Sequence, residues 1–116
     1  MHIPHRLAVG TAEGVAAVWD VAACQPAWRG GPPSTRAAVV AVCWTGPGPH
    51  RWLAVLHEGN ELVLCDPWAG GALWAGQVGE PKAQPLRAMT ADPGNRSTLL
   101  AWGPKGHLTL LMVQVT

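Results

Sequence analysis

The chain has 116 residues, a formal net charge of +1, and only 13% charged residues. This length fits one small domain, and the near-zero charge gives no electrostatic support for binding nucleic acid or an acidic membrane. Hydrophobic residues make up 48% of the chain, which is enough for a buried core, and no apolar run is long enough for a transmembrane helix.

Short apolar runs separated by turn signals fill the chain from end to end. The first stretch, LAVGTAEGVAAVWDV at 7–21, places two such runs around TAEG. Runs this short, bounded by Gly and Pro, predict strands rather than helices. The predicted strands cover 6–10, 15–20, 26–30, 39–44, 52–56, 61–66, 72–76, 85–90, 98–102 and 107–112. Periodicity alone leaves a buried helical turn open at 53–56, but the repetition of the flanking turns favours a strand.

The sequence matches itself, without gaps, at an interval of 46 residues. Each copy has an apolar run that begins at Leu7, Leu53 or Leu99. In the turn that follows, a residue type tolerant of positive φ recurs at Gly14, Asn60 and Gly106. In the same register Asp20 falls on Asp66, Trp28 on Trp74, Val40 on Leu86, and the GPG at 46–48 on the DPG at 92–94. The interval predicts a repeat architecture with four short strands per unit.

The third strand of the first unit ends in Val18-Trp19-Asp20. Four strands per unit, a period in the forties and this Trp-Asp ending together resemble the WD40 repeat. The dipeptide is degenerate in the later units, which read Leu64-Cys65-Asp66 and Leu110-Leu111-Met112. The Gly-His pair that opens many WD40 repeats is absent before both complete first strands, so the resemblance rests mainly on the register.

The WD40 resemblance implies an all-β fold of antiparallel four-stranded blades in a partial β-propeller. Residues 1–116 form one such domain, with blade pieces at about 5–30, 37–76 and 85–116. A closed propeller has about four to eight blades, whereas this chain has about two and a half. We therefore expect a C-terminal fragment or isoform of a longer WD40 protein, with exposed sheet edges at both ends.

The resemblance also assigns structural roles to polar and aromatic residues. Trp19 is expected in the core, and Trp44 and Trp102 are expected to be packed within strands. Trp28 and Trp74 are either binding anchors or packed in the outer layer, and their equivalence favours packing. Trp52 and Trp68, next to turns, are the better surface candidates. The structural set is Trp19, Asp20, Asp66, Trp28 and Trp74.

WD40 propellers bind partners mainly through the loops of one rim and the channel mouth. In this register those loops join the second to the third strand and the fourth to the first strand. The candidate partner-binding residues they carry, with Arg87 from an inner strand, are Glu13, Arg36, His57, Glu58, Lys82, Arg87 and Lys105. The alternative is that these side chains are ordinary solvated loop charges.

No catalytic, cofactor-binding or metal-binding residues are predicted. The only His pair at ligand spacing, His2 and His5, has no third ligand nearby. There is no P-loop, no G-x-G-x-x-G, no nucleophile elbow and no CxxC pair. Three unevenly spaced cysteines, Cys24, Cys43 and Cys65, favour a reducing compartment. We expect a cytoplasmic location, with the nucleus as the alternative.

These features favour a non-enzymatic scaffold segment that binds protein partners of a multiprotein complex. A regulatory sensor propeller of a larger NTPase or other multidomain enzyme is the first alternative, and sequence upstream of Met1 would distinguish it. A ribonucleoprotein scaffold is the second alternative, which the scattered Arg residues make less favoured. No membrane partner is expected, and nucleic acid is not favoured.

Overall fold

The computed structural model describes residues 6–30, 37–45, 52–67, 71–78, 85–92, 95–103 and 108–112. Its strands are β1 (Arg6–Gly10), β2 (Ala16–Asp20), β3 (Gln25–Gly30), β4 (Val39–Thr45), β5 (Trp52–His57), β6 (Glu61–Asp66), β7 (Gly71–Gln77), β8 (Ala88–Asp92), β9 (Asn95–Trp102) and β10 (Leu108–Met112). All pairings within them are antiparallel. The predicted all-β class is therefore confirmed, and the 53–56 run belongs to a strand.

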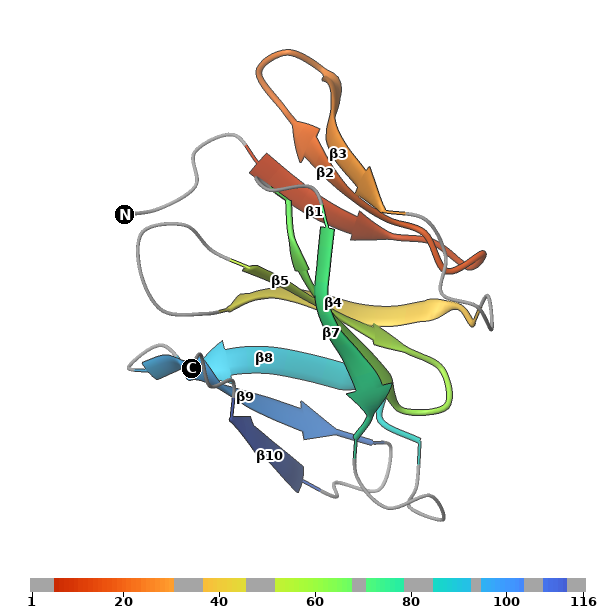
Figure 1. The fold of residues 1–116 in the computed structure, drawn as a ribbon, viewed down its shortest axis with the longest axis vertical. Helices are drawn as coiled ribbons and strands as arrows, with labels where there is room; N and C mark the ends of the chain where they lie inside the picture. Colours follow the sequence, from red (N-terminus) through yellow and green to blue (C-terminus); the bar gives the residue numbers. More distant parts are fainter. Residues whose placement is uncertain are drawn as a thin grey trace.

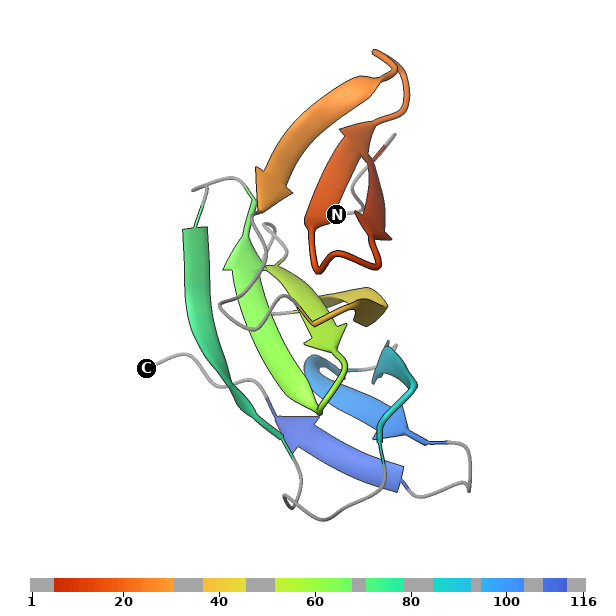
Figure 2. The ribbon, with the colours of Figure 1, turned by 90° about the vertical axis from the view of Figure 1, so that its right-hand side faces the viewer.

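The strands form three sheets in the orders β1-β2-β3, β4-β5-β6-β7 and β8-β9-β10, here called blades 1, 2 and 3. Figure 1 shows them stacked along the long axis of the molecule, with blade 1 at the top and blade 3 at the bottom. Strand β4 contacts β1 on one side and β8 and β9 on the other. Blade 2 therefore lies between its two neighbours, as Figure 2 also shows.

The predicted 46-residue register holds for the second, third and fourth strands. Leu7 pairs with Trp19, and its repeat Leu53 pairs with Cys65. Both outer strands also share one irregularity, a register shift after Val18 in blade 1 and after Leu64 in blade 2. The equivalence of these strands extends to their bulges.

The register of the first strand differs from the gap-free prediction by one residue. Val42 pairs with Val55 in blade 2, but Met89 pairs with Ala101 in blade 3, where the 46-residue interval would place Ala88. The connection from first to second strand is shorter in blade 3, with Asp92 opposite Asn95, so β8 is displaced along β9. Strand β8 begins at Ala88, later than the predicted 85–90.

Successive side chains of a strand point to opposite faces of its sheet. Those that face a neighbouring blade form two apolar clusters, one at each junction between blades. Between blades 1 and 2 the buried residues are Ala16, Val18, Leu53, Val55 and Cys65. Between blades 2 and 3 they are Ala54, Leu56, Leu62, Leu64, Val78, Leu86, Met89, Leu99 and Ala101. Blade 2 thus buries both faces of its sheet, which explains the nearly continuous apolar run WLAVL.

Candidate functional site: the turn rim

Two turns between second and third strands occupy one rim of the molecule. The first runs from Thr11 to Val15, where the Thr11 N–H donates to Val15 O at 2.9 Å and the Val15 N–H donates to Thr11 Oγ1 at 3.1 Å. Gly14 has a φ of 89° and its equivalent Asn60 a φ of 62°. The predicted positive φ is confirmed at both positions, and Gly106 lies outside the described residues.

Hydrogen bonds fasten both turns to the segment that enters β4. The Val39 N–H donates to Thr11 O at 3.0 Å, and the Glu58 N–H donates to Ala38 O at 2.9 Å. Because Ala38 and Val39 are adjacent, the two turns lie side by side. The Asn60 side chain extends the connection to blade 3, where its Oδ1 accepts from the buried Leu86 N–H at 2.7 Å. The backbone of this rim is therefore fixed from blade 1 to blade 3.

Two of the predicted partner-binding residues come together on this rim. The Arg87 guanidinium lies 3.9 Å from the Glu58 carboxylate, and their side chains are 54% and 57% exposed. An ion pair this exposed contributes little to stability. Its charges therefore remain accessible to a partner. Arg87 directly precedes β8, and its N–H donates to Trp102 O.

The remaining rim candidates divide into three groups. Glu13 is exposed in the first turn. His57 is only 2% exposed, ends β5, and has its Nδ1 2.8 Å from Ala37 O, so its side chain supports the strand entry rather than the surface. Three predicted residues lie outside the described part of the chain: Arg36, Lys82 and Lys105.

Four tryptophans differ from their predicted places: Trp19, Trp102, Trp52, and Trp74, which was expected to be packed but is 47% exposed. Trp19 is 39% exposed and Trp102 is 37% exposed, so neither is a core residue. Both side chains lie on sheet faces that no other described blade covers. Trp52 was expected at the surface but packs partly buried against the cluster between blades 2 and 3. Trp44, by contrast, is packed as predicted, and Trp68 lies outside the described residues.

Trp28 and Trp74 occupy equivalent positions on the outer strands, opposite Val18 and Leu64. Each indole lies over the glycine two residues further along its strand. A Cβ on Gly30 would lie 2.5 Å from the Trp28 ring, and a Cβ on Gly76 would lie 2.6 Å from the Trp74 ring. Trp28 packs against the cluster between blades 1 and 2, whereas Trp74 is 47% exposed. Equivalent positions therefore have unequal burial.

Asp20 and Asp66 end the third strands, as the register predicts. Asp20 accepts a hydrogen bond from the Ala23 N–H at 3.1 Å and lies 4.0 Å from Arg6. The carboxylate therefore stabilises the turn that leads to β3 and also faces a cation from β1. Asp66 is partly buried at the end of β6.

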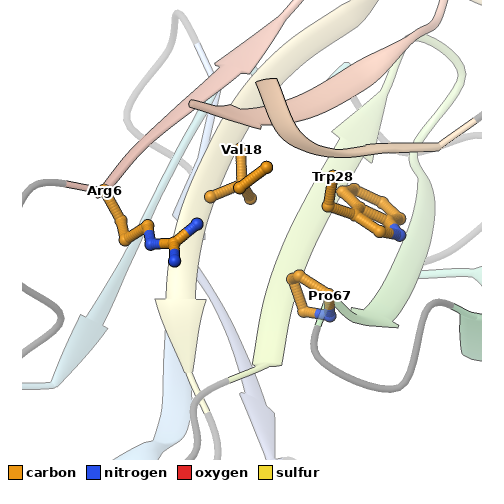
Figure 3. A pocket seen from close by; sticks show the side chains of 5 residues that line it. Arg6, Val18, Trp28 and Pro67 are labelled. Carbon is orange, nitrogen blue, oxygen red and sulfur yellow. The ribbon is translucent and has the colours of Figure 1, made fainter. Parts of the chain in front are cut away.

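A small groove between blades 1 and 2 has no counterpart among the residues predicted from the sequence. It encloses about 220 Å³, and Figure 3 shows the labelled side chains around it: Arg6, Val18, Trp28 and Pro67, with Ala27 completing the lining. Arg6 and Pro67 come from different blades, so only the packing of blades brings them together. The groove lies at the opposite rim from the Thr11–Val15 turn, since β1 begins there.

Two of the three thiols are shielded from solvent chemistry. Burial raises the pKa of the Cys43 thiol from 9.0 to about 11, and burial does the same to Cys65. Cys24 is exposed in the turn before β3. Since only thiolates are good nucleophiles and ligands, Cys43 and Cys65 act as small packed hydrophobic residues at neutral pH.

Among the described residues, no three or more His, Cys, Asp or Glu side chains lie together in a group that could hold a metal ion. Within the same residues no helix has the length and hydropathy needed to cross a membrane.

No protein-family model matches the chain, and no curated protein matches it. Solved structures do. The β-propeller domain of Myceliophteria thermophila Cps50 (Swd1) aligns with a TM-score of 0.72 and 20% identity over 96% of this chain and 33% of that one. A chain of the mitotic checkpoint complex aligns with a TM-score of 0.70 and 19% identity over 91% of this chain and 31% of that one.

The fold is that of a β-propeller. The predicted resemblance is confirmed at the level of the fold, and the three sheets are blades of such a propeller. The chain spans about a third of the length of the two propeller structures. In propeller terms, blade 2 is a complete four-stranded blade, whereas the described strands of blade 1 lack the first strand and those of blade 3 lack the fourth.

Proposed function

We propose that the chain is a non-catalytic protein-interaction segment, a section of a larger WD40-type propeller that binds protein partners within a complex. The coverage of about a third of each propeller structure supports the larger assembly. So does the blade count, because closed propellers have about four to eight blades. The reducing compartment favoured by the cysteines makes the cytoplasm, or else the nucleus, the proposed location.

The observation that carries this proposal is the fixed, charged rim. Glu58 and Arg87 are more than half exposed and lie on segments that backbone hydrogen bonds hold in place. Glu13 lies exposed on the neighbouring turn. Rigid display of a few charged side chains lowers the entropic cost of ordering them on binding. The rim thus displays three charged side chains in a chain with only 13% charged residues.

The alternatives predict different neighbours for this section. A sensor propeller of an NTPase requires a nucleotide-binding region elsewhere in the same protein, so the longer open reading frame tests that alternative. A ribonucleoprotein scaffold requires RNA at the rim. The paired Glu58 and Arg87 give the rim mixed charge, which favours a protein partner over an RNA backbone.

Site-specific photo-crosslinking tests the proposal. A photoreactive amino acid replaces Glu58 on the rim, and a matched variant carries it at Ala23, which is exposed in the turn at the opposite rim. Both are expressed in cells and irradiated. We expect a discrete protein adduct from position 58, sensitive to protease and resistant to nuclease, and no such adduct from position 23.

Two outcomes contradict the proposal. Equal adducts from both positions show non-specific contact, and a nuclease-sensitive adduct from position 58 shows a nucleic-acid surface. As a second measurement, the photoreactive amino acid is placed at Glu13, which is exposed on the neighbouring turn, and the charge reversals Glu58→Lys and Arg87→Glu are introduced singly and together. The double variant restores an ion pair with its charges exchanged. If the adduct is lost in either single variant and is still absent in the double variant, the partner contacts the individual charges rather than requiring the ion pair.

A further inference from the structure

The groove between blades 1 and 2 differs from the same place at the next junction. The 46-residue interval places Trp52 at the position of Arg6 and Leu64 at the position of Val18. Trp52 packs against the apolar cluster between blades 2 and 3, and Leu64 is buried in that cluster. At the first junction a guanidinium replaces the indole and a smaller valine replaces the leucine. The groove therefore lies where the neighbouring junction is filled by apolar side chains.

Packing between the blades does not account for a cation at this place. An apolar side chain at position 6 would be stabilised by burial, as Trp52 is in the second junction. The Arg6 side chain instead lines the groove and is 34% exposed. Asp20 Oδ2 lies 4.0 Å from Arg6 Nη2, which is longer than a hydrogen bond. The guanidinium therefore retains N–H donors for a ligand.

The other side of the groove is apolar. Figure 3 shows the Trp28 indole and the Pro67 ring across the groove from the Arg6 guanidinium. The indole is held in place, because its ring lies over Gly30 and packs against the cluster between blades 1 and 2. Aromatic grooves of this kind bind prolines and other apolar side chains, and a fixed ring loses little entropy on binding. The groove thus offers one cationic and one apolar contact.

The size and charge of the groove limit its occupant. Its volume of about 220 Å³ is below the roughly 300–1,000 Å³ of sites that enclose a cofactor or drug-sized ligand. The groove has room for side chains rather than for a whole small molecule. Phosphate-binding surfaces use clusters of Arg, whereas a single Arg with Asp20 4.0 Å away suits a singly charged carboxylate. The chemistry that fits is therefore a carboxylate beside an apolar group.

We propose that the groove binds a short extended segment of a partner protein, with an Asp or Glu side chain on Arg6 and an apolar side chain or proline against Trp28 and Pro67. The partner's carboxylate accepts charge-assisted hydrogen bonds from the guanidinium. Side chains two residues apart in an extended segment lie on the same side, roughly 7 Å from each other. Both contacts can therefore come from one short segment.

This site is separate from the charged rim of the proposed function. The groove lies at the opposite rim from the Thr11–Val15 turn, and its lining residues belong to two described blades. It therefore does not depend on further blades. A segment in the groove is not expected to crosslink to position 58, and if it reaches position 23 its adduct differs in mass from the adduct at position 58. The two proposals fail separately.

Selection from a phage library of short random peptides tests the proposal. The 116-residue chain and its Arg6→Gln variant are immobilised and selected in parallel. We expect peptides with Asp or Glu close to Pro or a large apolar residue on the unmodified chain, and loss of that class on Arg6→Gln. Arg29→Gln removes an exposed cation of β3 that does not line the groove. This matched control should select the same peptides as the unmodified chain.

An enriched acidic peptide is then titrated into isotope-labelled protein, with the tryptophan indole N–H resonances as the readout. We expect a saturable shift at Trp28 and none at Trp74, which occupies the equivalent position in blade 2. Arg6→Gln should weaken binding about tenfold or more, because it removes hydrogen bonds to a charged group. Arg6→Trp introduces the side chain of the second junction and should abolish binding. The amide spectrum checks the folding of both variants.

The peptide itself supplies a test that requires no protein variant. Replacing its acidic residue with Gln should weaken binding to the unmodified chain by a factor similar to that of Arg6→Gln. Any of four results overturns the proposal: no enrichment of acidic peptides, equal selection on Arg6→Gln, equal shifts at Trp28 and Trp74, or unchanged binding of the Gln peptide. Tighter binding when phosphoserine replaces the acidic residue also overturns it, because the site would then be a phosphate site.

Discussion

The two junctions between blades in this chain bury equivalent sheet faces with different side chains. At the junction of blades 1 and 2, blade 1 contributes the small side chains Ala16 and Val18, and a turn carbonyl, Thr11 O, accepts the hydrogen bond from the Val39 N–H. At the junction of blades 2 and 3, blade 2 contributes the larger Leu62 and Leu64, and the Asn60 side chain accepts the hydrogen bond from the Leu86 N–H. The repeat therefore conserves the arrangement of faces, while side-chain volume and the source of the acceptor vary.

Close approach at the first junction has a specific requirement. A Cβ on Gly10 would lie 2.2 Å from Val39 Cγ1, far inside contact distance. The repeat of Gly10 is Leu56, which is fully buried at the second junction. Blade 1 thus packs its backbone against a valine where blade 2 fills the same position with a leucine.

The largest expected effect is on the free energy of unfolding. It concerns two leucines at equivalent repeat positions, one on a sheet face packed against a neighbouring blade and one on an exposed face. Leu99→Ala should lower the free energy of unfolding by about 2–5 kcal/mol, because it removes a fully buried side chain and leaves a cavity. Leu7→Ala, at the equivalent exposed position, should change it by less than about 0.5 kcal/mol in the monomer. Urea unfolding at low protein concentration measures both. Equal losses would show that Leu7 is covered within the single chain.

The second prediction concerns the close approach in the first junction. Gly10→Ala should cost about 1–3 kcal/mol, since the new methyl group forces Val39 or the strand to shift. Val39→Ala in the same chain should recover most of the loss caused by the added methyl. Thermal or urea unfolding of the two single variants and the double variant gives the coupling. Additive losses would mean that the two positions do not touch.

The third prediction concerns the hydrogen bond from the Leu86 N–H to Asn60 Oδ1 in the second junction. Asn60→Gly keeps a backbone able to adopt φ of 62° but removes the acceptor for Leu86 N–H, and it should cost about 1 kcal/mol. Asn60→Ala adds the strain of the left-handed conformation, roughly 1–2 kcal/mol more. Amide hydrogen exchange at Leu86 should accelerate in both variants. Unchanged exchange at Leu86 would assign its protection to another group.

The smallest effect is alkaline and belongs to the shielded thiols. The folded chain holds the Cys43 and Cys65 protons to a pKa of about 11, against 9.0 without burial. The two buried neutral thiols therefore make their full contribution to the free energy of unfolding below pH 9. That contribution is lost as the pH rises from 9 toward about 11. A chain with Cys43→Ala and Cys65→Ala should show a shallower decline of unfolding free energy over that interval.

Alkylation of the native chain gives an independent check of the thiols. Exposed Cys24 should react with iodoacetamide at neutral pH, and the two shielded thiols should react only after unfolding. Mass spectrometry of the digested protein identifies the labelled positions. Rapid labelling of Cys65 in the native chain would contradict its place in the first junction.

Local sequence determined the strands and the turns of this protein. Short apolar runs bounded by Gly and Pro favour strands, and a residue tolerant of positive φ lies in both described turns between second and third strands, at Gly14 and Asn60. The equivalence of Trp28 and Trp74 was also readable, because their strands pair in the same register. These features depend on residues close together in the chain.

The tertiary structure decided which faces are covered and which charges meet. Leu7 and Leu53 have nearly the same local sequence, yet one is 56% exposed and the other 0%, because burial depends on a neighbouring blade rather than on the strand itself. The exposure of Trp19, the pairing of Glu58 with Arg87 and the groove at Arg6 and Pro67 have the same origin. Sequence periodicity fixes which side of a strand a residue occupies, and only the stacking of sheets fixes what lies against that side.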